Sequence, residues 1–388
     1  MKEKYTLKIS RSISEIPREA WNSLVTQDTI PFLEWEWLAA LEESGSVCPG
    51  THWYPLHLSL WDRTRLVAAA PFYLRTSSYG EYVYDYFWAE AAASLNRPWY
   101  PKLVGAVPAT PAEGYRFLCA REVNEEELTR LIICAAEDIC RKNNVAGLHI
   151  LFADPLWGAG LEGLGFTAWE HSYFLWENEG FSSFEDYLER FNKNQRRNIR
   201  REYAHPRRQG VTVRIVPGEE AGEEHFRRMF ALFTITNDKF IPWDARYVNE
   251  EFFLRLEKDF RKNIAFVEAR RADAAEGGLI ALAFLIRKGG RLWGRFWGAY
   301  EDVKDLHFAA CYYAPIDWAI GENIRFFDPG AGSPHKVRRG FRPVTGKSYH
   351  KFFDPVLERL FKNNIDAVND YERHTVEELN AELPFKRQ

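Results

Sequence analysis

The chain has 388 residues, enough for two or three folded units at roughly 150 residues each. Its composition, 46% hydrophobic and 27% charged, allows a large buried core and excludes a disordered chain or a coiled coil. The formal net charge of −4 is divided unequally, because residues 1–176 sum to −7 and residues 177–388 to +3. An anionic ligand is therefore expected at the second half, and the overall balance argues against a dedicated DNA-binding protein.

The five cysteines form no CxxC pair, so we expect no metal site and no disulfide, and we interpret them as buried reduced thiols. The longest apolar runs, 66–74 and 279–286, are well below the roughly 18 residues that a membrane-spanning helix needs. The first ten residues are charged and strand-like and lack an apolar signal region. These features predict a cytoplasmic protein with no transmembrane segment.

The first half is expected to begin with a strand, two short helices and a hairpin, at residues 5–10, 16–24, 33–43 and 54–74. A long helix is predicted over 124–143, because Asn124 is a suitable N-cap and three glutamates follow it. Strands at 147–152 and 166–176 complete this half.

The second half shows the same succession of elements. The expected strands and helices lie at 211–216, 220–237, 249–262, 264–269, 279–287, 291–300, 306–321 and 324–328. The order β-α-α-β-β-β-α-β thus occurs twice, and it resembles the order of elements in the GNAT acyltransferase fold. We therefore predict an α+β protein of two tandem GNAT-like domains with a cleft between them, at 1–176 and 177–388. The second is expected to start with a basic helix at 190–208 and to end in a helix at 354–372.

The segment 190–208 carries eight lysines and arginines against one acid, Glu202. Arginines spaced by four residues, such as Arg197 and Arg201, lie on the same side of a helix, as do Arg196 and Arg200. Such crowding of like charge is offset either by solvent and acidic protein surface or by a phosphate-bearing ligand. Arg197 and Arg200 are accordingly candidates for contact with the phosphates of a donor or of tRNA.

The segment DPGAGSPHKVRRGF, residues 328–341, is the best candidate for a ligand site. A strand is expected to end at Asp328, and the following glycines and prolines predict a turning loop with exposed backbone. Glycine lets backbone N–H groups approach an anion closely, and arginine supplies forked donors. The candidates for anion binding are Gly330, Gly332, Lys336, Arg338 and Arg339. His335 is a candidate to donate to an oxyanion or to a leaving group, and a mobile basic surface loop is the alternative.

An aromatic segment at 82–102 contains two carboxylates, Asp85 and Glu90. Desolvation by aromatic neighbours would raise the pKa of such a carboxyl group, as a general base for an amine requires. An aromatic core wall with two carboxylates at its rim explains the pattern equally well. In the second half, an inward-facing Arg295 would need an anionic partner, and His307 at a helix start could act as a base or simply pack.

Several stretches of this chain together resemble the bacterial family of "peptidogalycan biosynthesis/recognition" proteins. They read GEYVYDYFWAEAA, WYPKL, VPATPAEGYR, FNKNQRRNIRRE, LWGRFWG, LHFAACYYAPIDWAI and GAGSPHKVRRGF. The resemblance runs from about residue 32 to 372, and it implies an N-acyltransferase with tandem GNAT domains. The family in turn resembles the Fem-type aminoacyl-tRNA-dependent transferases, which share a basic segment like Arg197-Asn198-Ile199-Arg200. Where the better-known branch has a GAQGEHK-like loop, this chain has residues 330–336, GAGSPHK.

The resemblance implies transfer of an acyl or aminoacyl group to an amine, with acyl-CoA or aminoacyl-tRNA as the donor. With a pI near 6.3, we favour the smaller donor, and the acceptor is expected to be a small-molecule or peptide amine. Two alternatives stay open: a Fem-like aminoacyl-tRNA-dependent transferase, and a non-catalytic binder of cell-wall precursors or RNA. No Walker A, GxSxG, HExxH or strand-linked GxGxxG motif supports an NTPase, hydrolase, zinc protease or dehydrogenase.

Overall fold

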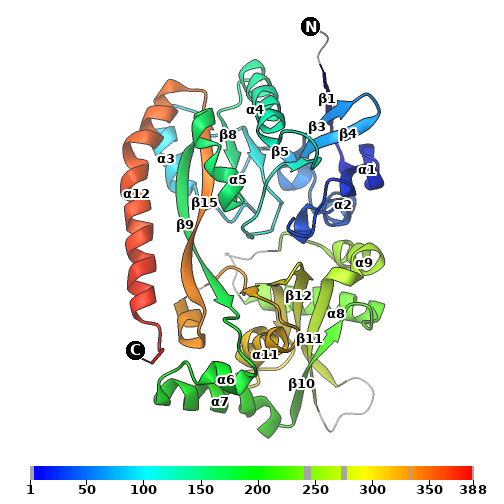
Figure 1. The fold of residues 1–388 in the computed structure, drawn as a ribbon, viewed down its shortest axis with the longest axis vertical. Helices are drawn as coiled ribbons and strands as arrows, with labels where there is room; N and C mark the ends of the chain where they lie inside the picture. The colour runs from blue at the N-terminus through cyan, green and yellow to red at the C-terminus, as the bar shows by residue number, and fades with distance from the viewer. Residues whose placement is uncertain (1–3, 240–245, 272–277, 333, 387–388) are drawn as a thin grey trace. The chain divides into compact units, whose positions relative to one another are not determined.

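The structure, a computed structural model, describes residues 4–239, 246–271, 278–332 and 334–386 (Figure 1). The chain divides into two compact units, of which unit 1 comprises Met1–His171 and Thr345–His374. Unit 2 comprises Ser172–Val344 and Thr375–Gln388. The expected division at residue 176 lies close to the first of these boundaries, but the assignment of residues 345–374 to the second domain is wrong.

Unit 1 has α-helices α1 Arg18–Asn22, α2 Trp35–Glu43, α3 Tyr86–Ser94, α4 Glu125–Lys142 and α5 Pro155–Ala159. Its strands are β1 Thr6–Ser10, β2 Trp53–Pro55, β3 His57–Asp62, β4 Arg65–Ala70, β5 Phe72–Arg75, β6 Lys102–Gly105, β7 Leu118–Cys119 and β8 Gly147–Ile150. One sheet has the order β1-β3-β4-β7. In the other, the order is β15-β8-β6-β5-β2, with β15 spanning Arg342–Phe352.

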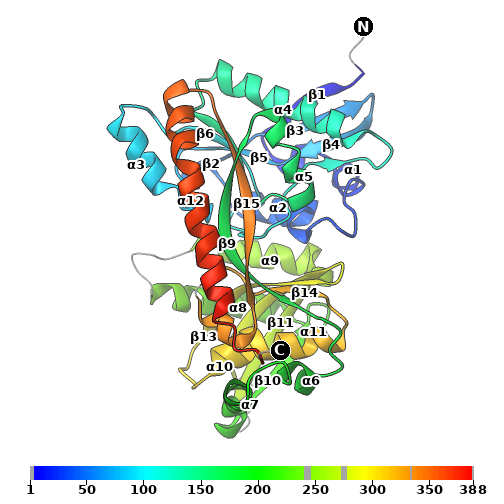
Figure 2. The same cartoon turned by 60° about the vertical axis from the view of Figure 1, so that its left-hand side comes forward.

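Residues 345–374 belong to unit 1 because they complete its sheet and its core. Strand β15 pairs with β8 in antiparallel register, with His350 opposite His149. Helix α12, Pro355–Ala381, follows β15 and buries apolar residues such as Phe361 against Trp88 and Trp169. Asn369 of α12 also accepts a hydrogen bond from the backbone N–H of Glu170 at 2.8 Å. Figures 1 and 2 show this helix running beside β15.

Unit 2 has helices α6 Phe184–Leu188, α7 Lys193–Arg208, α8 Glu223–Asp238, α9 Glu250–Asp259, α10 Leu306–Phe308 and α11 Ala314–Gly321. Its strands are β10 Val211–Pro217, β11 Ile264–Arg271, β12 Leu279–Lys288, β13 Arg291–Ala299 and β14 Phe326–Asp328. With β9, Thr167–Glu177, which begins in unit 1, they run in the order β10-β11-β12-β13-β14-β9. The hairpin between β12 and β13 turns at Gly289-Gly290, both at positive φ, as expected from the sequence.

Local sequence explains most of these boundaries. Helix α4 begins where expected, because the side chain of Asn124 accepts a hydrogen bond from the N–H of Glu127 at 3.0 Å. The expected hairpin over 54–74 is present, but each arm is interrupted, at Leu56 and at Pro71, so that β2 and β5 separate from β3 and β4. Their strands consequently belong to two different sheets.

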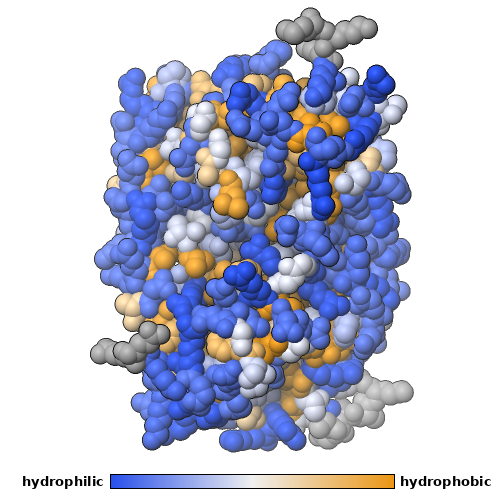
Figure 3. All heavy atoms as spheres, in the orientation of Figure 1, coloured by the Kyte–Doolittle hydropathy of each residue, from blue (hydrophilic) through white to orange (hydrophobic). Residues whose placement is uncertain are grey.

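The surface and the cysteines add two observations. Figure 3 shows hydrophilic residues over most of the face in view, with apolar residues in small separate groups. Within the described ranges, no helix combines the length and the apolar character needed to cross a bilayer. All five cysteines are free thiols, but only Cys140 is buried, Cys134 is exposed and the other three are half-buried, so the expectation of buried thiols holds for Cys140 alone.

Candidate active site

The glycine-rich loop follows β14 in unit 2 and is fixed by its own polar groups. Gly330 has a φ of +83°, and a Cβ there would lie 2.7 Å from the carbonyl oxygen of Gly294, so glycine is required. The N–H of Gly330 donates to Oδ1 of Asp328 at 2.7 Å, and Nζ of Lys336 donates to the carbonyls of Gly330 and Ala331 at 2.6 and 3.0 Å. The expectation that the Gly330 N–H is free to receive an anion is therefore wrong, because the loop uses it to hold itself together, whereas Lys336 stays a candidate for anion binding.

The segment Pro334–Arg339 is a 3₁₀ helix, whereas an extended segment was expected. The two adjacent arginines nonetheless face different surroundings. Arg338 is exposed, and Arg339 is buried with its guanidinium 3.4 Å from the ring centroid of Phe308. Arg339 donates to Oε2 of Glu202 at 3.0 Å and to the carbonyl oxygen of His335 at 2.9 Å.

The arginine that braces the loop against Asp328 is Arg295, with Nη2 at 3.4 Å from the carboxylate oxygen. This inward-facing arginine has the anionic partner that its position on β13 requires. Gly340 closes the segment at a φ of +84°, and its missing Cβ leaves room for the hydroxyl of Tyr187. That hydroxyl donates to the carbonyl oxygen of Arg339 at 2.9 Å.

Two histidines meet beside this loop. Nε2 of His335 and the hydroxyl oxygen of Tyr312 lie 2.9 Å apart, and the His335 and His307 ring centroids are 6.3 Å apart. Burial lowers the pKa of His307 to about 4, assisted by His335 and by the positive charges of Arg339 and Lys336. Burial and the same two cations also lower the pKa of His335. Both imidazoles are therefore neutral at pH 7 and can accept a proton.

We call His307, Tyr312, His335, Lys336 and Arg339 the histidine–arginine cluster. Its backbone carries an irregularity that accompanies many functional sites, because residues Ala309–Tyr313 form a π-helical turn between α10 and α11. Burial lowers the pKa of Lys336 to about 8. The cluster thus combines neutral proton acceptors with a strongly positive local field, a combination suited to chemistry in which a proton leaves an amine and negative charge develops nearby.

The carboxylates expected to act as bases lie in unit 1, and Asp85 does not have the expected character. Burial works to raise the pKa of Asp85, but Lys102, with the hydrogen bonds from Ser78 and Trp99, outweighs it and lowers the pKa. Nζ of Lys102 lies 2.5 Å from the Asp85 carboxylate. The prediction of a raised pKa is therefore wrong, because a buried lysine neutralises this carboxylate. Glu90 is exposed on α3.

Helix α7 is the basic helix expected from the sequence, capped by the side chain of Asn192. Arg200 forms an ion pair with Glu185 through two nitrogens, at 3.0 and 2.6 Å from Oε2. Arg197 is exposed, and both arginines stay candidates for phosphate contact rather than established ligands. The placement of the glycine-rich loop in a cleft between the domains also stays a prediction.

Sequence reasoning missed the partners that hold the cluster. Glu202 links Arg339 to the hydroxyl of Tyr313, which donates to its carboxylate at 2.5 Å. The available signal was that Glu202 is the one acid within a strongly basic segment, as expected of a residue turned toward an internal cation. Tyr312 carried no separate signal, because it reads as an ordinary core aromatic.

Comparisons with known proteins address the fold and the family. FemX is similar at 11% identity, over 92% of this chain and 100% of that chain, with a TM-score of 0.52. The C-terminal domain of a protein named as a lysylphosphatidylglycerol synthetase from Agrobacterium fabrum is similar at 11% identity, over 94% and 97%, with a TM-score of 0.50. A tandem GNAT protein from the clavulanic acid pathway has 10% identity over 90% and 99%, with a TM-score of 0.45. FemX and the Agrobacterium fabrum domain thus share the fold of this chain, and the fold class is α+β, as expected from the sequence.

No curated protein matches the chain by sequence. The FemAB-like family model, described as "Peptidogalycan biosysnthesis/recognition", matches residues 12–387. This match covers nearly the whole chain and, together with the fold, supports a transferase. The protein therefore belongs to the FemAB-like family.

Proposed function

We propose that the protein is an N-acyltransferase, which moves an acyl or aminoacyl group from an activated donor to an amine at the histidine–arginine cluster of unit 2. One observation carries this proposal: two neutral imidazoles, His307 and His335, lie beside two buried cations, Lys336 and Arg339. Asp85 is a poor alternative base, because its carboxylate already accepts hydrogen bonds from Lys102 and from the indole N–H of Trp99.

The reaction forms an amide and conserves its protons. The amine nitrogen attacks the donor carbonyl, a C–N bond forms, and the bond between the carbonyl carbon and the sulfur or oxygen of the leaving group breaks. The amine loses one proton and the leaving group takes one up, so a single imidazole can carry it from one to the other. We assign this role to His335, which is half-buried at the loop, and the positive charges of Arg339 and Lys336 favour the oxyanion.

Two donors fit the proposal, and salt dependence distinguishes them. An aminoacyl-tRNA would be attracted by exposed arginines of α7, such as Arg197, and several phosphate contacts would make its binding strongly salt-dependent. Six such contacts would weaken binding by about 10³-fold between 50 and 200 mM salt. Acyl-CoA carries fewer phosphates and should show a shallower slope. We favour acyl-CoA because the chain as a whole is slightly acidic.

The test is a coupled measurement of both products. The purified protein is incubated with panels of acyl-CoA or aminoacyl-tRNA donors and amine acceptors, and mass spectrometry detects the amide while a thiol or deacylation assay detects the leaving group. We expect His335→Asn to abolish both products and Glu90→Gln to leave both unchanged. Loss of transfer in Glu90→Gln with retention in His335→Asn would refute the site, and binding of precursors or RNA without transfer by any donor would favour the non-catalytic alternative.

A further inference from the structure

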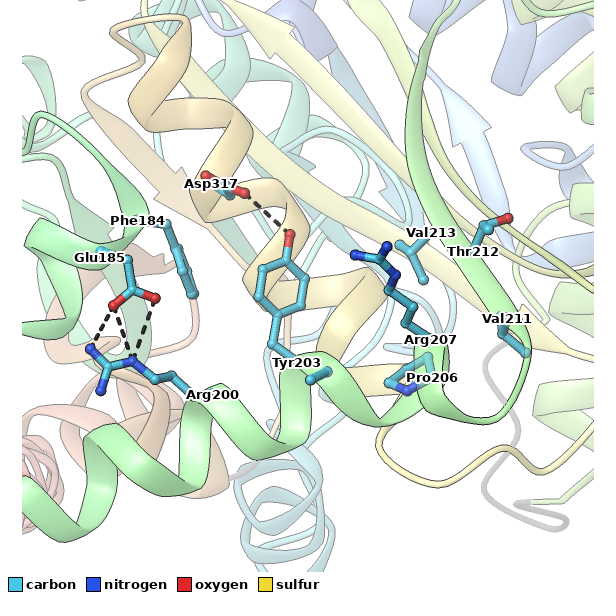
Figure 4. A pocket seen from close by; sticks show the side chains of 11 residues that line it. Phe184, Glu185, Arg200, Tyr203, Pro206, Arg207, Val211, Thr212, Val213 and Asp317 are labelled. Atoms are coloured by element: carbon cyan, nitrogen blue, oxygen red, sulfur yellow. Dashed lines mark hydrogen bonds and ion pairs between the residues drawn. The ribbon is translucent and has the colours of Figure 1, made fainter. Parts of the chain in front are cut away.

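Unit 2 contains a groove that the proposed reaction does not use. It runs along α7, with walls from α6, β10 and α11, and its volume is about 780 Å³. This size is within the range of roughly 300–1,000 Å³ that is usual for small-molecule sites. Figure 4 shows its side chains converging from these elements.

The floor of the groove is apolar and aromatic. Phe184 and Tyr203 contribute rings whose centroids lie 5.1 Å apart, and the half-buried Val213 of β10 contributes aliphatic surface. An apolar segment of a ligand would therefore be covered on this floor, with a favourable free energy from the removal of its surface from water.

Some charged side chains of the groove form ion pairs with one another and others do not. Arg200 and Glu185 form a two-nitrogen ion pair and cancel one another. Asp317 accepts a hydrogen bond at 3.3 Å from the hydroxyl of Tyr203, an uncharged donor. Arg207 points into the groove between Tyr203 and Val213 (Figure 4), and within the described part of the chain it takes part in no ion pair. One anionic and one cationic position are therefore left without an opposite charge.

We propose that this groove binds a zwitterion in which an ammonium and a carboxylate are joined by an apolar segment. The carboxylate meets Arg207, whose forked donors suit it, and the ammonium meets Asp317. The apolar segment lies across the ring of Tyr203, which lies between Asp317 and Arg207 in Figure 4. This site goes beyond the proposed transfer reaction, and its occupancy does not depend on that reaction.

The test uses terminal-amino carboxylates of increasing length, namely aminohexanoate, aminooctanoate and aminoundecanoate, with binding measured by calorimetry on the full chain. Octanoate and octylamine, which each retain one charge, are the matched analogues. We expect one of the zwitterions to bind at least about tenfold more tightly than either analogue, because each analogue lacks one charge-assisted contact. A tenfold difference in affinity corresponds to about 1.4 kcal/mol of binding free energy, which one such contact can supply. Equal binding of zwitterion and analogues, or no binding of any length at millimolar concentration, overturns the proposal.

Three variants locate the two charges. Arg207→Gln should remove the preference for aminooctanoate over octylamine, and Asp317→Asn should remove its preference over octanoate. Arg208→Gln is the control, since Arg208 is the next residue on α7, is exposed and does not line the groove. An equal loss of binding in Arg208→Gln would show that the helix attracts the ligand through its general charge, and the site assignment would be wrong. Because these readouts concern binding alone, a failure of the transferase assay leaves them interpretable.

Discussion

Each unit of this protein buries a lysine almost completely, and the surroundings shift the pKa values of the two lysines in opposite directions. Lys102 in unit 1 is 2% exposed and lies between two acids, Glu81 at 2.7 Å and Asp85 at 2.5 Å. Burial alone would lower its pKa, but these two carboxylates outweigh burial and raise it. Lys336 in unit 2 is 1% exposed and bonds to backbone carbonyls, so burial lowers its pKa to about 8.

The different surroundings of the two lysines distinguish charges that stabilise the fold from charges that can act on a substrate. In unit 1 each charged group of the network has a counter-ion, because Arg75 also pairs with Glu81 at 3.1 Å, and Trp99 adds a hydrogen bond to Asp85 at 2.8 Å. Every charged group there lies beside a group of opposite charge. This pairing stabilises one arrangement of the side chains and leaves little uncompensated charge to bind a substrate. In unit 2 the cations of the histidine–arginine cluster are incompletely neutralised, and two proton acceptors stand beside them.

The largest expected effect comes from removing the lysine of unit 1. Lys102→Met leaves Asp85 as a buried carboxylate without a cation, and we expect unit 1 to lose about 3–5 kcal/mol of stability. Hydrogen exchange read by mass spectrometry reports the loss separately for each unit. Adding Asp85→Asn should restore part of the stability. No recovery in the double variant would mean that lost packing, and not an uncompensated charge, explains the effect.

The next effect concerns a pair of histidines in the core of unit 1. Nδ1 of His149 lies 2.7 Å from Nδ1 of His350, and burial lowers the pKa of both well below 6.5. The unfolded chain takes up protons below about pH 6.5 while the folded pair does not, so stability falls with decreasing pH by about 1.4 kcal/mol per unit for each histidine. For the pair, this predicts a loss of roughly 4 kcal/mol at pH 5.

The control for this pH dependence is the double variant His149→Gln/His350→Gln. Glutamine does not titrate, and two glutamines can still form a hydrogen bond with each other. We expect the urea-unfolding free energy of the variant to fall much less between pH 7.5 and pH 5 than that of the wild type. The same fall in both proteins would mean that other groups cause the acid sensitivity.

The third prediction concerns catalysis in unit 2. His335→Asn should lower the rate of transfer at least about 100-fold, as loss of a general acid–base does, while stability changes by less than about 0.5 kcal/mol. His335 is half-buried, and no large apolar side chain is removed. The measurement is kcat with the best donor and acceptor, together with the unfolding free energy. A large loss of stability would instead give His335 a structural role, like that of Lys102.

The same comparison explains what the sequence could and could not predict. Periodicity and turn residues predicted the elements of the second half from β10 to β14 and the helix α4 in the first, because helix faces, N-caps such as Asn124 and the Gly289-Gly290 turn act locally. They did not predict β15, Arg342–Phe352, which directly follows the segment 328–341 that was interpreted as a ligand loop. The strand is fixed instead by its pairing with β8, about 200 residues earlier in the chain.

The candidate site was only partly accessible for a related reason. The sequence singled out His335 and Arg339 in the glycine-rich loop and, separately, His307 at a helix start, and the structure brings the three into one cluster. It also placed Asp85 among aromatics, which was correct, but the shift of its pKa depends on Lys102, a residue 17 positions away in the chain. Desolvation can be anticipated from neighbours in sequence, whereas the identity of a buried counter-ion requires the fold.

The smallest expected effect returns to the lysine of unit 2. Because Lys336 has a folded pKa of about 8 and an unfolded pKa near 10.4, the folded chain binds fewer protons between these values. Stability therefore rises with pH in this window, by about 1.4 kcal/mol at pH 9 relative to pH 7. Lys336→Met should remove that rise, as measured by hydrogen exchange in unit 2 at both pH values. Lys102→Met should leave the rise in unit 2 intact, and a rise that persists in Lys336→Met would show that this ammonium keeps its ordinary proton affinity in the folded loop.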